Sequence, residues 1–210
     1  MLNIQSFTFN PFQENTYLIY NDSKDCIIID PGMYSASEQI EFDDFINQNA
    51  LNPVQLINTH CHIDHIFGNK YCVDKYQLGL CIHKNEIPVL DSGNNTARIY
   101  GLNYDESPLA SQFIVENGII ELGDETLNIL YTPGHSPGSL SFHSSKDGFV
   151  IAGDALFYES IGRTDLPGGD YDTLIRSIKT QLLSLPDDTI VYSGHGPKTS
   201  VGHEKTRNPF

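Results

Sequence analysis

The first thirty residues alternate apolar with polar positions or gather apolar residues together, which is the pattern of β-strands. Strand-forming residues occupy positions 2–9 and 16–20, and positions 26–29 are an unbroken apolar run closed by Asp30-Pro31-Gly32. Such a run is typical of a strand buried on both faces, and the Pro-Gly pair ends it with a turn. We therefore expect three strands before the first helix.

Helical and extended patterns alternate in the next eighty residues. Ser35 and Glu38 have the spacing of a capping box, and the apolar residues of 40–49 form one helical face. Residues 91–110 are rich in Gly, Asn, Ser and Asp, so they predict a loop that forms the wall of a site. The segments between these two stretches predict a strand at 54–59, a helix at 66–76 and a strand at 78–82.

The second half of the chain repeats this alternation without an internal sequence repeat. Apolar residues four apart, Leu174, Ile178 and Leu182, predict a helix. No linker or change of composition marks a boundary, so we expect a single domain over residues 1–210, with a two-layer sheet core covered by helices. Short apolar runs between Gly and Asp turns predict strands at 113–115, 119–122, 126–131, 139–142, 149–152 and 189–192.

Composition and charge narrow the range of partners. The chain has 12 basic and 27 acidic side chains and a net charge of −15, without the basic patch that nucleic-acid binding needs. Its four cysteines form no Cys-x-x-Cys pair, as expected for reduced thiols. The sequence shows no leader pattern and no apolar run near the roughly 18 residues of a membrane span. We expect a cytoplasmic protein with a small-molecule substrate and neither a nucleic-acid nor a membrane partner; its oligomeric state is left open.

Four metal-ligand side chains fall within six residues, at His60, His62, Asp64 and His65. In an extended segment, residues two apart point to the same side, so His60 and His62 are expected to converge while Cys61 points away and packs. Imidazole and carboxylate groups bind zinc, iron and manganese. The density of such groups favours a metal site over a polar loop.

Three further ligand-type residues follow apolar strands at His135, Asp154 and His195. Ligands at strand ends can meet along one edge of a sheet, where α/β proteins commonly place their sites. Seven nitrogen and oxygen donors exceed what a four-coordinate structural site uses, which also argues against a binding protein that keeps metal only for stability. They suffice for two neighbouring metals that share a water. The sequence therefore predicts a dinuclear centre.

The motif THCHIDH at 59–65, followed by the three later ligands, resembles the metallo-β-lactamase superfamily. The resemblance implies an α/β (α+β) fold, a four-layer αββα sandwich of two mixed sheets flanked by helices. It implies two divalent metal ions, zinc first, with iron or manganese as alternatives. By the same resemblance one metal is bound by His60, His62 and His135, the second is bound by Asp64, His65 and His195, and Asp154 bridges them.

Within that superfamily the chain resembles the glyoxalase II (hydroxyacylglutathione hydrolase) group, in its short single-domain branch. The resemblance implies hydrolysis of a thioester such as S-lactoylglutathione by a metal-bridging hydroxide, with Asp64 orienting the water or taking its proton. Arg163 aligns with an active-site lysine of the family and is predicted to bind a substrate carboxylate, although a surface pair with Asp165 or Asp170 explains it equally well. The matching segments are ENTYLI at 14–19, IIDPG at 28–32, YTPGHSPGS at 131–139, AGDALF at 152–157, IGRTDLPGGD at 161–170 and GHEKTRNPF at 202–210.

Other activities use the same residues. A persulfide dioxygenase would bind one iron through His60, His135 and Asp154, and an acyl-homoserine lactone lactonase would need all seven ligands. A serine hydrolase is disfavoured because Pro137, after the serine of the G-x-S-x-G pattern at 134–138, has no N–H for an oxyanion hole. The remaining histidines are expected to have structural roles: His83, His143 and His203.

Overall fold

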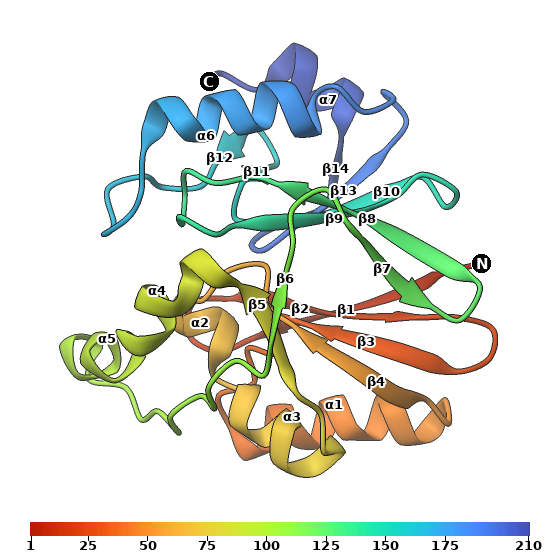
Figure 1. Ribbon diagram of the computed structural model, residues 1–210, viewed down its shortest axis with the longest axis vertical. Coiled ribbons are helices and arrows are strands. Elements are labelled where there is room, and N and C mark those ends of the chain that lie inside the picture. Colours follow the sequence, from red (N-terminus) through yellow and green to blue (C-terminus); the bar gives the residue numbers. More distant parts are fainter. The chain divides into compact units, whose positions relative to one another are not determined.

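The computed structural model describes all residues from 1 to 210, and they form two compact units (Figure 1). Unit 1 comprises residues 1–114 and 122–125, and unit 2 comprises residues 115–121 and 126–210. A six-stranded sheet lies at the centre of each unit. The expectation of a single domain over 1–210 stays a prediction.

The sheet of unit 1 has its strands in chain order, from β1 to β6. The first three strands are antiparallel, and β3 to β6 are parallel to one another, so the sheet is mixed. The strands are β1 (Asn3–Phe9), β2 (Glu14–Tyr20), β3 (Asp25–Ile29), β4 (Asn52–Ile57), β5 (Leu80–His83) and β6 (Gln112–Ile114).

The core of unit 1 forms where α1 (Ala36–Gln48) covers one face of this sheet. Phe42 and Ile46 of α1 are buried in one cluster with Phe7 and Leu18 of the strands. The predicted capping box begins α1. The Ser35 hydroxyl accepts from the N–H of Glu38, and the Glu38 carboxylate accepts from the N–H of Ser35. As predicted, the apolar run of β3 is buried on both faces.

The prediction of one helix over 66–76 is wrong in its beginning, because the chain forms two helices, α2 (Ile63–Ile66) and α3 (Asn69–Tyr76). The break lies at Gly68, whose N–H donates to the Pro31 carbonyl at 2.6 Å. A Cβ at Gly68 would lie 2.7 Å from that same oxygen, so a glycine is needed for this approach. This contact fixes α2 against the turn that follows β3.

The prediction of a loop over 91–110 is also wrong in its first half. The 3₁₀ turn η1 (Lys84–Glu86), α4 (Ile87–Asp91) and α5 (Gly93–Tyr100) are helical, and the irregular stretch begins after Gly101. Ala97 of α5 is buried with Ile63 and Phe67 beside α2. Tertiary packing therefore stabilises a helix that its Gly- and Asn-rich sequence disfavours.

The sheet of unit 2 has the order β14-β13-β10-β9-β8-β7. β10 and β13 are parallel, whereas β8 with β9, β9 with β10 and β13 with β14 are antiparallel, so this sheet is mixed as well. The strands are β7 (Ile119–Leu122), β8 (Glu125–Tyr131), β9 (Leu140–Ser144), β10 (Phe149–Gly153), β13 (Ile190–Ser193) and β14 (Thr199–Ser200).

Helices of unit 2 cover one face of its sheet (Figure 1). The predicted helix is α6 (Tyr171–Ser177), which continues into the π-helical turn η2 (Ile178–Leu182), and its apolar face packs on Val150 and Val191. A short hairpin of β11 (Leu156–Phe157) and β12 (Ser160–Ile161) and the helix α7 (Val201–Arg207) were not predicted. Among all the helices, none is both long and apolar enough to cross a membrane.

Candidate metal centre

Three imidazoles converge in unit 1, in the segment that runs from the end of β4 through α2. The ring centroids of His60 and His62 are 4.8 Å apart, and those of His60 and His65 are 4.1 Å apart. The chain is irregular from residue 58 to 62, and His62 is the extended residue before α2 begins. His60 and His65 are fully buried. The backbone thus gathers the histidines of the HxHxDH motif, as the alternation of side chains predicts.

Asp30 supports two of these imidazoles from behind. Its Oδ2 accepts from His65 Nδ1 at 3.1 Å and from the Thr59 hydroxyl at 2.6 Å, and its Oδ1 accepts from the Thr59 N–H at 2.7 Å. Because the Thr59 hydroxyl donates to Asp30, it accepts from His60 Nδ1, which lies 3.0 Å away. Both imidazoles therefore carry their proton on Nδ1, and their Nε2 lone pairs are available to a metal.

Asp64 stands at the start of α2, and its position is set by the turn after β3. Its Oδ2 lies 3.7 Å from His65 Nε2, and its backbone carbonyl accepts from Asn10 Nδ2 at 3.0 Å. The same amide group donates to the Gly32 carbonyl at 3.0 Å. A Cβ at Gly32 would lie 2.0 Å from Glu14 Oε2 and 2.8 Å from the Asp64 carbonyl, so only glycine fits here.

Two carboxylates are buried beside His65 without a Lys or Arg partner. Glu14 and Asp30 are at most 1% exposed, and their ion-pair contacts are with His65 Nδ1, at 3.8 Å and 3.1 Å. Burial raises the pKa of Glu14 well above its usual value. Burial thus disfavours the charged form of Glu14, and a divalent cation held by these histidines would supply the positive partner that the ionised carboxylate needs.

Unit 2 brings the other three predicted residues together. Asp154 Oδ2 lies 3.4 Å from His135 Nε2 and 3.5 Å from His195 Nε2. Each of the three follows a strand of the sheet, as predicted: His135 after β8, Asp154 after β10 and His195 after β13. The Gly194 N–H donates to the Gly153 carbonyl at 2.8 Å, which holds two of these strand ends side by side.

The second nitrogen of His135 is held by the backbone. His135 Nδ1 lies 2.7 Å from the Arg163 carbonyl, which can only accept, so the proton is on Nδ1 and Nε2 faces Asp154. The turn before it needs a glycine: Gly134 has a φ of +128°, and a Cβ there would lie 2.2 Å from the backbone of Leu174. The donor set in each unit thus combines imidazoles with carboxylates, and His60, His65 and His135 are protonated on Nδ1; such a set suits zinc, iron or manganese.

Comparison with known proteins decides the family. The model of the metallo-β-lactamase superfamily matches residues 9–195, a range that includes all seven predicted ligands. This chain belongs to the metallo-β-lactamase superfamily. The predicted fold, with two six-stranded mixed sheets flanked by helices, is confirmed by the solved structures of the superfamily that it matches.

Similar proteins in the superfamily include metal-dependent hydrolases. The chain is 39% identical over 202 residues to the probable metallo-hydrolase YqgX of Bacillus subtilis, covering 95% of this chain and 93% of the relative. It is 37% identical over 213 residues to the hydroxyacylglutathione hydrolase GloC of Haemophilus influenzae, covering 100% and 98%. The predicted resemblance to hydroxyacylglutathione hydrolases is thus confirmed.

Two solved structures of the superfamily match over nearly the whole chain. The BLEG-1 B3 metallo-β-lactamase has a TM-score of 0.90 and 36% identity, covering 99% of each chain. TTHA1623, in a di-iron-bound form, has a TM-score of 0.87 and 35% identity, covering 98% of this chain and 99% of its own. These structures show that this fold carries a lactamase in one case and binds two irons in another.

Arg163, the predicted substrate-binding residue, forms a bidentate ion pair on the surface of unit 2. Its Nε and a terminal nitrogen donate to Asp165 at 2.6 Å and 2.7 Å, and both side chains are more than half exposed. The Arg163 pair lowers the pKa of Asp165 to about 2. The surface-pair alternative is therefore what the structure shows, and a role in substrate binding stays a prediction.

The other reactive-looking side chains have structural surroundings. Cys61 is buried in the core of unit 1, where burial raises the pKa of its thiol well above the usual value. His83 accepts from the Asn85 N–H at 3.3 Å at the start of η1. His143 is buried on β9, and His203 stacks on Tyr158 with ring centroids 5.0 Å apart. The structural roles predicted for the remaining histidines agree with these contacts.

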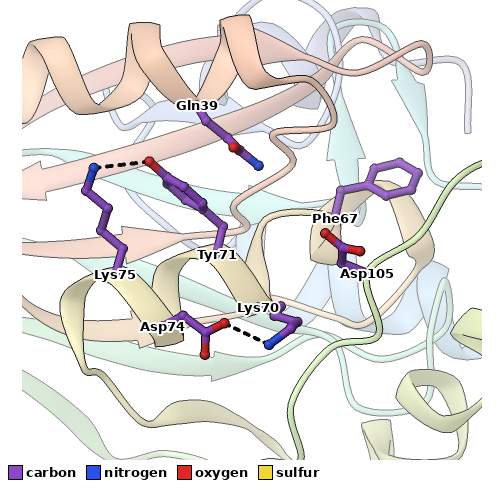
Figure 2. A pocket seen from close by; sticks show the side chains of 7 residues that line it. All are labelled: Gln39, Phe67, Lys70, Tyr71, Asp74, Lys75 and Asp105. Atoms are coloured by element: carbon purple, nitrogen blue, oxygen red, sulfur yellow. Dashed lines mark hydrogen bonds and ion pairs between the residues drawn. The ribbon is translucent and has the colours of Figure 1, made fainter.

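A surface pocket of unit 1 contains none of the predicted ligands (Figure 2). It measures about 360 Å³. Its two lysines are already engaged, Lys70 with Asp74 at 2.7 Å and Lys75 with Tyr71 at 3.2 Å and with Asp43. Both cations of the pocket are thus paired within the chain, and the ligand clusters are the candidate site.

The residues that sequence analysis missed are those that hold the ligands. Asp30 and Glu14 were visible only as members of the segments that carry the resemblance, IIDPG and ENTYLI. A carboxylate directly after a fully apolar strand was the available signal for Asp30, since such a side chain must find partners. The Arg163 carbonyl had no signal, because any residue presents the same backbone group.

Proposed function

We propose that this chain is a thioester hydrolase that uses two divalent metal ions and acts on substrates such as S-lactoylglutathione. The observation that carries the proposal is the 37% identity to GloC over the full chain, together with a complete set of seven donors. The proposed ligands of one metal are His60, His62 and His135, those of the second are Asp64, His65 and His195, and Asp154 is shared. Zinc is the first candidate, and the di-iron form of TTHA1623 supports iron as the alternative.

When bound, two such ions lower the pKa of a shared water toward roughly 7 and polarise the thioester carbonyl. The residues of the chain supply the rest. Asp64 has a partly exposed carboxylate next to His65, so it can orient the attacking water and accept its proton. The leaving thiolate has a pKa of about 8.5, so it departs without protonation by a general acid. This explains why the site needs no nucleophilic serine or cysteine.

The carboxylates of the glutathione portion need a cation, and Arg163 is the proposed partner. Its planar guanidinium can bind a carboxylate bidentately, as it binds Asp165 in the structure. A substrate carboxylate would therefore have to displace Asp165 from the Arg163 guanidinium. Since the pair is exposed, that exchange costs little.

A second candidate function is β-lactam hydrolysis, which the 36% identity and TM-score of 0.90 to the BLEG-1 B3 metallo-β-lactamase favour. A lactam needs the same attack of water on a polarised carbonyl, but its leaving amine must be protonated. The persulfide dioxygenase and lactone hydrolase alternatives use the same donors. Substrate therefore has to be decided by assay.

The test combines metal content with turnover on the same purified protein. We expect close to two metals per chain and hydrolysis of S-lactoylglutathione, with turnover lost in His62→Ala and Asp154→Asn. Asp172→Asn, an equivalent change at an exposed position of α6, is the matched control and should keep both the metal content and the turnover. Turnover of a chromogenic β-lactam or an acyl-homoserine lactone instead of the thioester would contradict the proposed substrate. One iron per chain with oxygen uptake on glutathione persulfide would overturn the hydrolase.

A further inference from the structure

The C-terminal helix of unit 2 contains a buried carboxylate whose hydrogen bonds go to neighbouring segments. Glu204 of α7 is 1% exposed. Its Oε1 accepts from the Thr199 hydroxyl at 2.5 Å, and its Oε2 accepts from the Glu159 N–H at 3.0 Å and from Asn208 Nδ2 at 2.8 Å. Glu204 thus joins α7 to β14, to the β11–β12 turn and to the tail that follows the helix.

Asn208 makes the second link to the same turn. Its Nδ2 donates to the Ser160 carbonyl at 3.0 Å as well as to Glu204, so both amide hydrogens are used. Its Oδ1 accepts from the Phe210 N–H at 3.1 Å. We refer to Glu204 and Asn208 together as the tail clamp. The clamp binds two adjacent backbone groups, the N–H of Glu159 in the hairpin turn and the carbonyl of Ser160 at the start of β12.

The hairpin that the clamp holds lies next to two of the predicted metal ligands, Asp154 and His135. β11 starts two residues after Asp154, and β12 ends two residues before Arg163, whose carbonyl accepts from His135 Nδ1 at 2.7 Å. Gly162, which lies between the end of β12 and Arg163, packs closely against Asp154 and His135. A Cβ at Gly162 would lie 1.8 Å from the Asp154 carbonyl and 3.0 Å from His135 Nδ1. A shift of the hairpin would therefore move the acceptor of His135 and the backbone of Asp154.

We propose that the tail clamp is a positioning device for the metal centre. It holds the β11–β12 hairpin so that the Arg163 carbonyl keeps His135 in its Nδ1-protonated form and Asp154 in place. The inference rests on the metal centre of the proposed function but not on its substrate. Glu204 and Asn208 bind no metal themselves; they act through the backbone of Glu159 and Ser160.

The hairpin depends on such an external support. β11 and β12 pair over only two residues each, and a two-stranded ribbon of this size is not stable alone. The ladders of β8, β10 and β13 do not include the hairpin. Leu156 of β11 is buried in the core of this sheet and its carbonyl accepts from the Ser193 hydroxyl at 2.7 Å, so the part of the hairpin that depends on the clamp is its turn at Glu159 and Ser160. Loss of the clamp should therefore loosen the hairpin while unit 2 stays folded.

The first test uses the metal-free protein. In protein labelled with ¹⁵N at histidine, we expect a His135 spectrum of the Nδ1-protonated tautomer, with an Nδ1–H that exchanges slowly. Asn208→Ala and Glu204→Gln should shift His135 toward a mixture of tautomers with fast exchange. Lys205→Ala is the matched control, because Lys205 lies on the same helix but contacts Asp187 and the Leu185 carbonyl, and it should leave the spectrum unchanged.

The second test measures metal affinity with a chelator on the full chain. We expect the clamp variants to bind one of the two ions about 10–100-fold more weakly, the range typical when the support of a metal-binding histidine is removed. The urea midpoint of the metal-free Asn208→Ala protein should stay close to that of Lys205→Ala. Because Asn208 is at the edge of the clamp, this variant is informative even if Glu204→Gln unfolds.

The outcomes separate the clamp from the proposed function. An unchanged His135 spectrum and metal affinity in Asn208→Ala would overturn the clamp. A loss of affinity that only follows the loss of stability of the metal-free protein would also overturn it, because the role would then be structural. If the wild-type chain takes up no metal, the proposed function fails, whereas the tautomer of His135 in the metal-free variants still decides the clamp.

Discussion

Replacing Asp30 by Asn tests whether one buried carboxylate organises the histidines of unit 1. Asn is the suitable substitute, because residue 30 has a φ of +50°, a conformation that Asn adopts more readily than Ala. The side chains have nearly the same size, so no cavity is created. What changes is one acceptor oxygen, which becomes an NH₂ donor facing groups that themselves donate, His65 Nδ1–H and the Thr59 hydroxyl.

The magnitude follows from the bonds that are lost. Asp30 accepts three hydrogen bonds of 2.6–3.1 Å while it is at most 1% exposed. Two of them end on the converted atom, and hydrogen bonds to a charged group are worth about 1.5–3 kcal/mol each. Allowing for partial rearrangement, we expect the metal-free protein to lose about 2–4 kcal/mol of unfolding free energy. An Nδ2 donor would also favour the Nε2-protonated tautomer of His65, so metal affinity should fall about 10–100-fold.

The assay is urea unfolding of the metal-free protein, followed by chelator competition on the metal-bound protein. Asp25→Asn is the matched control, since Asp25 lies at the exposed end of the same strand and accepts one bond from Asn52 Nδ2. That variant should lose less than about 1 kcal/mol. If Asp30→Asn matched Asp25→Asn in both measurements, the argument that Asp30 orients His65 and Thr59 would be refuted.

Three further predictions concern the surface pair, the thiols and the metals. Asp165→Asn should lower KM for carboxylate-bearing thioesters, because it releases Arg163 from the ion pair. The pKa of Asp165 is depressed to about 2, so the ion pair is complete above about pH 4, and we expect the same change in KM at pH 6 and at pH 8. An unchanged KM would remove Arg163 from substrate binding. In the native protein at pH 8 a thiol reagent should leave Cys26 unmodified, because burial raises the pKa of its thiol to about 12 and only about 10⁻⁴ of the side chain is thiolate. Denaturant should expose all four thiols to the reagent. Rapid labelling of Cys26 in the native protein would contradict its burial. Removal of metal by a chelator should lower the unfolding free energy by about 4 kcal/mol for each bound ion, relative to protein in metal at a thousand times Kd, and equal thermal midpoints would exclude a bound metal.

Sequence analysis was most successful where local pattern and chemistry coincide. The apolar run of β3 and the capping box at Ser35 were predicted from a few residues each, because burial and capping are determined by the residue itself and its near neighbours. The ligand-type residues His135, Asp154 and His195 were found because each comes within four residues of the end of an apolar strand. Such signals are contained within about six residues of sequence.

The elements that were missed depend on distant parts of the chain. α5 is a helix because Ala97 packs beside α2, and its own Gly- and Asn-rich sequence argues for a loop. The β11–β12 hairpin is held by Glu204 and Asn208, more than forty residues further along the chain. Neither contact leaves a periodicity in the sequence. Motif spacing therefore identifies candidate ligands, but not the residues that support them.

The two halves of the predicted centre are supported by different means. In unit 1 the Nδ1 of His65 donates to a buried carboxylate, and in unit 2 the Nδ1 of His135 donates to a backbone carbonyl that the tail clamp holds in place. A carboxylate acceptor makes an imidazole a stronger ligand than a neutral carbonyl does. Because the two supports share no hydrogen-bond partner, loss of Asp30 and loss of Asn208 should act additively on the stability of the metal-free chain. We therefore expect the metal affinity of the proposed centre to depend on Asp30 after β3 and on the tail clamp of unit 2 as well as on the seven proposed ligands.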